Sequence, residues 1–323
     1  MARFIVRRTI AMIIVLFAVS VLVFTIFNVL PGGDPAVRMA GRQATDTQIT
    51  AIRKEWGFDK GVVTQYTTTM EKVFTGNLQS YFTRLDVVNE IIKGLPRTLW
   101  LAFGAMVMWM IFSVALGLYS AMRAGAFSDR VLTLLAIIGI SMPVFWVGAL
   151  MNHYLGFKLG WFPNGGYVPL TENPIDWLYH MILPWTALAI LFIGIYSRIL
   201  RANVLETMSE DFVRTAKAKG LSERQVLLRH VLRNSMIPIV TLWGLDFGAI
   251  IGGGAILTET VFDLQGVGQY TADAIGQLDQ PPLIAVTMFG AFMIVFFNTL
   301  VDILYAKIDP RIRLDGSSAV GNR

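Results

Sequence analysis

Hydrophobic positions along the chain gather into six long, nearly uninterrupted runs that are separated by polar segments. A helix of about 20 mostly apolar residues is long enough to cross a lipid bilayer. All six runs reach that length, at residues 9–30, 98–122, 131–157, 181–200, 236–258 and 283–305. The pattern therefore predicts an all-α, polytopic membrane protein with six transmembrane helices.

The first run follows Arg3, Arg7 and Arg8 and so has the basic start of a signal peptide. Its apolar stretch from Ile10 to Leu30 is longer than the roughly 7–15 residues of a signal-peptide core, and no small-residue cleavage site follows it. We interpret residues 1–30 as a retained transmembrane helix.

Composition supports a membrane protein. Only 15% of the 323 residues are charged and 54% are hydrophobic, whereas a soluble domain has roughly 25% charged residues. The absence of cysteine excludes disulfide bonds, thiolate metal sites and a cysteine nucleophile, and it leaves the redox compartment undetermined.

The distribution of charge predicts the orientation. Residues 198–234 carry eight basic and four acidic side chains, whereas residues 259–282 have four acids and no Lys or Arg. Cytoplasmic loops are enriched in Lys and Arg, so both termini, the tail 306–323 and residues 201–234 are expected in the cytoplasm. Residues 31–97 exceed the loop length to which this rule applies, and the span order places them outside. The net charge of +5 thus reflects topology, and nucleic-acid binding is not indicated.

The extracytoplasmic region 31–97 is expected to be folded. Thr45 and Gln48 form a capping box that starts a helix, and Gly57 is a natural stop. A second helix is predicted from about Val62 to Phe74. The region could serve as a docking surface for an external partner or as a packing cap over the ends of the spans. The permease core is expected at 98–305.

The cytoplasmic segment 201–234 within that core is too polar to cross a membrane. Ser209 is predicted to cap a short helix that ends at Gly220, with acidic residues in its first turn and basic residues in its last. A second capping box, Ser222 and Gln225, starts the next helix. The result is a stub of about ten residues, roughly 15 Å long. It could project from the membrane or lie on the lipid headgroups as an interfacial helix.

Arg214-Thr215-Ala216, followed after three residues by Gly220, resembles the Glu-Ala-Ala-x-x-x-Gly motif of the permease subunits of ABC importers. Arg214 and Thr215 depart from the motif, and Arg233 stands where many members have proline. In that family the short helix is a coupling helix that sits in a cleft of the ATPase. The resemblance implies that the coupling residues are Asp211, Phe212, Arg214, Thr215, Ala216, Lys217, Lys219, Gly220, Leu221 and Ser222.

Further segments resemble, in order, the first permease of the dipeptide and oligopeptide branch of that family. They are Leu30-Pro31-Gly32-Gly33-Asp34-Pro35, Trp56-Gly57-Phe58-Asp59, Ser141-Met142-Pro143, Thr258-Glu259-Thr260-Val261-Phe262 and Asp309-Pro310-Arg311. The resemblance implies a bacterial inner-membrane location and a peptide substrate, with glutathione, haem and nickel complexes as alternatives. It also implies a second permease, an extracytoplasmic substrate-binding protein and two ATP-binding subunits that hold ATP and Mg²⁺.

Two groups of residues within the spans are candidates for helix packing or for the pore. Gly244, Gly248 and Gly252 form two consecutive small-x-x-x-small steps, which allow helices to approach closely. Asp246 lies on the same span, and a carboxylate inside a membrane faces either a polar cavity or a partner. Asp302 shares a face of the sixth span with Asn298. Pore lining and a structural role both remain open for these polar residues.

The chain contains no nucleotide-binding G-x-x-x-x-G-K-[ST] motif, so energy from ATP must come from partner subunits. The three histidines have no metal-ligand spacing, and no catalytic residue, cofactor site or metal site is predicted. A membrane enzyme or receptor and an ion-coupled transporter are the alternatives from other function classes. A membrane enzyme or receptor would need catalytic residues at one depth, and an ion-coupled transporter would show paired repeats with broken helices.

Overall fold

The computed structural model describes residues 2–29, 34–41 and 44–308, with side chains from residue 6 to residue 301. These residues contain helices and no strand. The described helices and π-helical segments (η) are α1 (Ala2–Phe24), η1 (Thr25–Val29), α2 (Pro35–Ala40), α3 (Asp46–Trp56), α4 (Val62–Thr75), α5 (Val87–Met122), α6 (Phe127–Ser141), α7 (Val144–Met151), η2 (Asn152–Lys158), α8 (Pro174–Met208), α9 (Asp211–Ala218), α10 (Glu223–Gln225), η3 (Val226–Val231), α11 (Leu232–Ala249), η4 (Ile250–Gly254), α12 (Ile256–Phe262), α13 (Val267–Gln277) and α14 (Gln280–Ile308).

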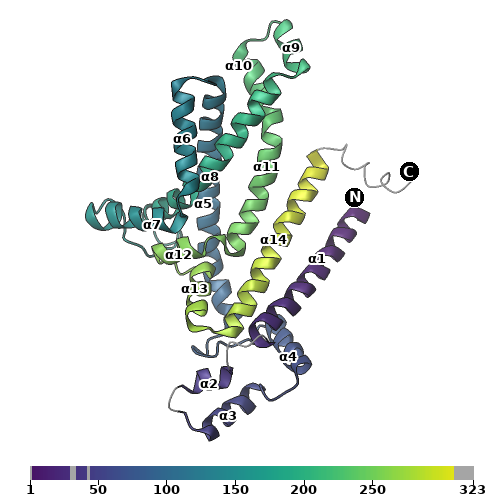
Figure 1. Ribbon diagram of the computed structural model, residues 1–323, viewed down its shortest axis with the longest axis vertical. Coiled ribbons are helices and arrows are strands. Elements are labelled where there is room, and N and C mark those ends of the chain that lie inside the picture. The colour runs from purple at the N-terminus through teal and green to yellow at the C-terminus, as the bar shows by residue number, and fades with distance from the viewer. Residues whose placement is uncertain (1, 30–33, 42–43, 309–323) are drawn as a thin grey trace.

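The long helices run along the longest axis of the molecule (Figure 1). Five of them are long and apolar enough to cross a membrane, and the bent pair of α6 and α7–η2 makes a sixth if it counts as one span. Helices α2 and α3 lie at one end of the axis, and α9 and α10 lie at the other. The predicted separation of residues 31–97 from residues 201–234 is therefore present in the fold. The predicted tail 306–323 lies outside the described residues from position 309 onward.

The third predicted span, 131–157, is not one continuous helix. The chain leaves helical geometry at Met142 and Pro143, and the helices on either side are bent by 98°. Proline cannot donate a backbone hydrogen bond, and it disfavours helical geometry in the residue before it. Met142 has φ −88° and ψ 130°, which is the extended conformation that this restriction imposes.

The fifth span also differs from the prediction of 236–258. Its helix starts earlier, at Glu223, and it ends at Gly254. Gly253 has φ 139°, a value that side-chain-bearing residues rarely adopt, so the chain changes direction there before α12 begins. The predicted last turn of this span therefore belongs to a separate short helix.

Helix α8 is much longer than the 20 residues predicted for the fourth span. Its 35 residues extend about 52 Å, whereas the hydrocarbon core of a bilayer is about 30 Å thick. The Asn173 side chain caps its first turn by accepting hydrogen bonds from the backbone N–H groups of Ile175 and Asp176. Its last turns lead directly toward α9, which makes α8 a continuous connection between the membrane and the polar end (Figure 1).

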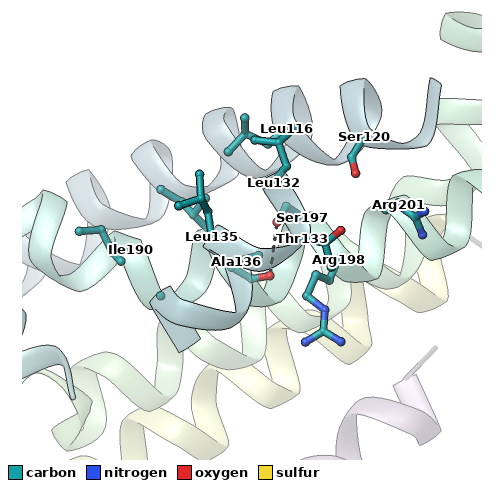
Figure 2. Close-up of a pocket in the computed structure, with 13 residues that line it drawn as sticks. Leu116, Ser120, Leu132, Thr133, Leu135, Ala136, Ile190, Ser197, Arg198 and Arg201 are labelled. Carbon is teal, nitrogen blue, oxygen red and sulfur yellow. Dashed lines mark hydrogen bonds between the residues drawn. The ribbon is translucent and has the colours of Figure 1, made fainter. Parts of the chain in front are cut away.

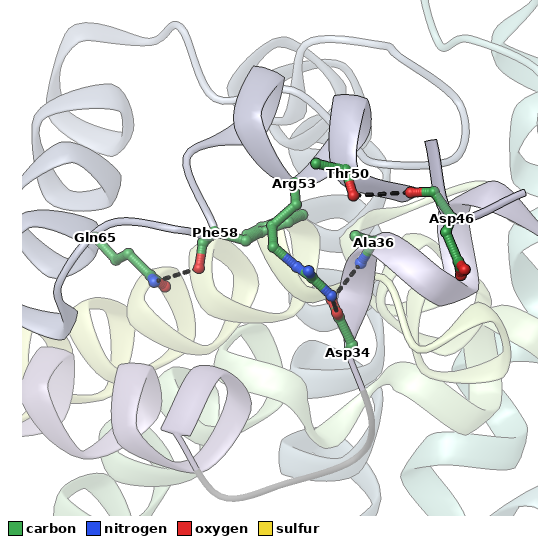
Figure 3. A network of polar contacts seen from close by, with 7 residues as sticks. All are labelled: Asp34, Ala36, Asp46, Thr50, Arg53, Phe58 and Gln65. Carbon is green, nitrogen blue, oxygen red and sulfur yellow. Dashed lines mark hydrogen bonds and ion pairs between the residues drawn. The ribbon is translucent and has the colours of Figure 1, made fainter. Parts of the chain in front are cut away.

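The two helices predicted within residues 31–97 are present, but residues 87–97 belong to α5, which begins at Val87 and not at the predicted position 98. The Thr45–Gln48 capping box is present, and Gly57 and Gly76 end α3 and α4 in the left-handed conformation. The Asp34 side chain accepts a 2.9 Å hydrogen bond from the Ala36 backbone and pairs with Arg53 (Figure 3). This ion pair joins the start of α2 to α3.

The buried core lies between α5 and α8, which pack along much of their length. Trp109 is fully buried and stacks on Phe192 with ring centroids 4.4 Å apart, while Tyr196 and Leu200 fill the next turns. Helix α1 packs against α14 at the edge of the bundle and leaves most of its apolar side chains exposed. Exposed apolar side chains on a spanning helix are available to lipid or to another subunit.

Candidate functional site

The short helix predicted in the cytoplasmic segment is α9. It is flanked by two turns at the end of the molecule opposite α2 and α3 (Figure 1). The prediction that Ser209 caps it is wrong, because Glu210 occupies the N-cap position and makes no side-chain cap. The Ser209 hydroxyl instead donates a 2.7 Å hydrogen bond to the Glu206 carbonyl at the end of α8. The short polar side chain thus closes the preceding helix.

One side of α9 is packed against its own chain. Val213 and Ala216 are 1% and 5% exposed, and they belong to the same buried cluster as Val226 and Val231 of η3. We expected Ala216 to offer surface to a partner. Its methyl group faces inward instead, because the neighbouring helix covers this apolar stripe.

Both apolar and basic side chains of this region remain exposed. Phe212, Leu221 and Leu228 are 41%, 37% and 45% exposed. We call these three residues and the exposed basic side chains beside them the coupling surface; the basic members are Arg214, Lys217, Lys219 and Arg229. Phe212 and Leu228 also line an open hollow together with His230 and Arg233. Exposed aromatic and aliphatic side chains surrounded by charge are typical of a protein interface.

The remaining predicted coupling residues lie at the two ends of α9. Asp211 pairs with Arg214 at 3.3 Å, and the Thr215 hydroxyl donates to the Asp211 carbonyl. Gly220 has φ 78°, as expected for the residue that ends this helix. Ser222 and Gln225 form the predicted capping box, which fixes the start of the next helix. Both ends of α9 are therefore held by defined turns.

Asp246 has a specific partner that the sequence did not indicate. The Tyr196 hydroxyl on α8 donates a 2.5 Å hydrogen bond to Asp246 Oδ2 on α11. Tyr196 is 1% exposed, and Asp246 is half-buried. The pair links α8 to α11 within the membrane and gives the carboxylate a structural role, while leaving part of it accessible.

We expect Asp246→Asn to retain the folded complex, because the amide oxygen still accepts the Tyr196 hydrogen bond. Asp246→Ala should lose about 1–3 kcal/mol of stability, because it leaves a buried hydroxyl without an acceptor. Thermal unfolding of the purified complex measures the difference. Equal melting temperatures for the two variants would show that Asp246 has no structural role. A change in uptake by Asp246→Asn alone would indicate that the charge faces the pathway.

The glycine stripe makes the predicted close helix contact, and its partner is α14 of the same chain. A Cβ atom on Gly248 would lie 2.8 Å from Phe297 Cβ, and one on Gly252 would lie 2.9 Å from the Gly290 carbonyl oxygen. A Cβ on Gly244 would overlap Val301. Side chains are thus excluded along this contact, and the stripe packs α11 and η4 against α14.

Asn298 is half-buried on α14, and the side chain of Asp302 lies outside the described residues. No group of histidine, cysteine or acidic side chains in the described part of the chain could hold a metal ion.

Two buried acids join elements that no sequence pattern connects. Asp129, 3% exposed, accepts two 2.8 Å hydrogen bonds from Arg201 of α8 and one from Ser120 of α5. Glu259, fully buried, accepts hydrogen bonds from Thr98 and from the Gln269 backbone in the first turn of α13. Burial raises the pKa of the Glu259 carboxyl, and these hydrogen bonds lower it in part. Both acids thus stabilise contacts between helices near the ends of the spans.

The chain matches known protein families along nearly its whole length. Residues 113–314 match the family described as binding-protein-dependent transport system inner membrane component. Residues 1–102 match the N-terminal component of the same transport systems. The fold is also similar to that of a crystal structure titled as an amino acid ABC transporter with histidines. The TM-score is 0.50 and the sequence identity is 17%, and the match covers 68% of this chain and 94% of that one.

Curated relatives are similar over their full length. A probable peptide ABC transporter permease of Sinorhizobium fredii is 36% identical over 97% of this chain and 100% of its own. A putative peptide transport system permease of Brucella abortus is 36% identical over 98% of this chain and 100% of its own. A glutathione transport system permease of Escherichia coli is 37% identical over 97% of this chain and 99% of its own. The chain belongs to the family of binding-protein-dependent transport system inner membrane components, the permease subunits of ABC importers.

Proposed function

We propose that this chain forms half of the translocation pathway for peptides and receives the movement of an ATPase through α9. The observation that carries the proposal is the coupling surface, which exposes Phe212, Leu221 and Leu228 at the end of the molecule. The described part of the chain leaves these side chains partly exposed, while the opposite side of α9 packs against η3. A helix that packs against its own chain on one side and exposes apolar side chains on the other is suited to transmit force from a partner.

The path for this movement follows from the connections of α9. It lies between α8 and the helix that starts at Glu223, so a displacement of α9 acts on both spans. The Tyr196–Asp246 hydrogen bond joins these two spans near mid-membrane, and Arg201–Asp129 joins α8 to the α5–α6 hairpin. We infer that the four helices move as one unit when the ATPases close or separate. Such movement of one bundle against another is the basis of alternating access.

Peptides are the proposed substrate because the relatives from Sinorhizobium and Brucella are named peptide permeases. The relative from Escherichia is named for glutathione, itself a small peptide derivative. The proposed partners are a second permease, two ATP-binding subunits that bind ATP and Mg²⁺, and an extracytoplasmic substrate-binding protein. The proposed location is the bacterial inner membrane.

The test is uptake by vesicles that contain the assembled transporter and its binding protein. We expect ATP-dependent uptake of a labelled peptide, reduced by excess unlabelled peptide. Competition by glutathione alone would identify glutathione as the substrate. Uptake driven by an ion gradient without ATP would instead support an ion-coupled transporter and overturn the proposal.

The orientation can be tested with single cysteines, because the native chain has none. Lys60 and Lys219 are both exposed in the structure, so neither position is shielded by the chain itself. We expect an impermeant maleimide added outside to label Lys60→Cys and to leave Lys219→Cys unlabelled until the membrane is opened. The reverse pattern would place α9 outside and exclude coupling to a cytoplasmic ATPase.

A further inference from the structure

A cavity of ≈ 170 Å³ opens between α5, α6 and α8. Its walls are mainly aliphatic, and they include Leu116, Leu135, Ile190 and Ile193. Its polar residues gather toward one end: Ser120, Arg198 and Arg201 lie away from Ile190 (Figure 2). A neighbouring hollow formed by Thr133, Ile140, Ile195 and Ile199 shares Arg198 and Arg201 with this cavity. We call this cavity and hollow the Arg198 groove.

The two arginines of the groove differ in their partners. Arg201 directs Nε and Nη2 to the two carboxylate oxygens of Asp129, each at 2.8 Å. Ser120 and the Gly125 backbone also donate to Asp129, so this acid is fully occupied. Arg198 is exposed, and it makes no hydrogen bond or ion pair with any residue that the structure describes. The groove therefore carries one uncompensated positive charge at its polar end.

The length of the groove fits one leaflet of a bilayer. Ile190 and Arg201 are 11 residues apart on α8, which corresponds to about 16 Å along the helix axis. Half of the hydrocarbon core is about 15 Å thick. A groove that begins at the headgroup level beside Arg201 therefore reaches the middle of the bilayer near Ile190. In the orientation proposed above, that headgroup level is the cytoplasmic one.

We propose that the Arg198 groove binds an anionic phospholipid. The Arg198 guanidinium holds the headgroup phosphate, and one acyl chain lies along Leu116, Leu135 and Ile190. Basic pockets between transmembrane helices on the cytoplasmic side are suited to such headgroups. The lining suits this ligand, because its aliphatic walls match an acyl chain and the unpaired Arg198 matches a phosphate.

The position of the groove gives the lipid a role in the transporter. It touches three helices whose cytoplasmic ends are joined by Asp129 and Arg201, and one of them, α8, leads into α9. A bound lipid fills the space between these helices and stabilises their joint movement. The binding itself does not depend on the proposed substrate or on coupling, so a failure here leaves those proposals unaffected.

The experiment is native mass spectrometry of the whole purified transporter with added phosphatidylglycerol or phosphatidylcholine. We expect Arg198→Gln to lower phosphatidylglycerol retention about fivefold, as for the loss of one basic contact at a membrane surface. Ala136→Phe, which fills the groove, should lower it as well. The matched controls are Arg130→Gln and Leu134→Phe, because both residues are exposed on α6 and neither lines the groove. Both controls should retain the lipid as the wild type does.

Equal phosphatidylglycerol retention in Arg198→Gln and Arg130→Gln would overturn the proposal. Complete displacement of the lipid by inorganic phosphate would also overturn it, because it would identify a free anion as the ligand. A disulfide between Leu135→Cys and the second permease would show that protein covers the groove, with the same consequence. Normal assembly of Arg198→Gln, judged by subunit stoichiometry in the same spectra, is the expected control for folding.

Discussion

Phe212→Asp should weaken binding of the ATPase by about 30-fold, because it replaces the aromatic side chain of the coupling surface with a carboxylate. Loss of a central aromatic anchor from an interface costs about 2 kcal/mol or more. An unpaired charge buried in an apolar contact adds to that loss. The variant should remain in the membrane with its spans intact, since Phe212 is 41% exposed and lies outside them. Pull-down of the ATPase and ATP-dependent uptake in vesicles measure the effect.

The control is Phe74→Asp, the same substitution on a side chain that is 80% exposed in α4 at the opposite end. It should leave ATPase binding unchanged. If α9 were an interfacial helix on lipid, Phe212→Asp would only weaken membrane contact and the ATPase would be recovered as from the wild type. That result would refute the coupling assignment.

Gly220 provides a second variant of the same surface that leaves its side chains in place. A Cβ atom there meets no other atom within 4 Å, but φ is 78°. Valine tolerates this conformation poorly and asparagine tolerates it well. Gly220→Val should therefore tilt α9 and reduce coupled uptake, whereas Gly220→Asn should retain it. Similar uptake by both would show that the left-handed turn does not position α9.

Gly252→Leu should lower the free energy of unfolding by about 3 kcal/mol or more and prevent recovery of a folded transporter. Its Cβ would lie 2.9 Å from the Gly290 carbonyl oxygen and 2.8 Å from Ile294 Cγ1. Overpacking costs typically 1–3 kcal/mol where side chains can adjust, and here one of the two obstacles is a backbone carbonyl. The measurements are membrane yield and thermal unfolding of the assembled complex.

Gly276→Leu is the matched control, because Gly276 lies inside α13 and a Cβ there has no atom within 4 Å. We expect wild-type yield from it. Gly248→Leu should resemble Gly252→Leu, since it overlaps Phe297 Cβ. Wild-type assembly of both stripe variants would mean that the stripe faces lipid and that α11 and α14 do not touch there.

Features that depend on a few neighbouring residues were predictable from the sequence. The capping boxes at Thr45 and Ser222 and the left-handed Gly57 and Gly220 occur where expected. Caps and turns are decided by residues within one helical turn of each other, so the order of residues contains the information. The close contact along the glycine stripe is similar, because small side chains at a four-residue spacing permit it whichever helix is the partner.

Features that depend on distant residues required the tertiary structure. Tyr196 and Asp246 are 50 positions apart, and Arg201 and Asp129 are 72 apart. No periodicity connects such pairs, since their approach is fixed by how whole helices pack. The Ala216 side of α9 shows the same limit. The sequence determined that this helix has an apolar stripe, and only the packing against η3 decided that its own chain covers Val213 and Ala216 and leaves Phe212 for a partner.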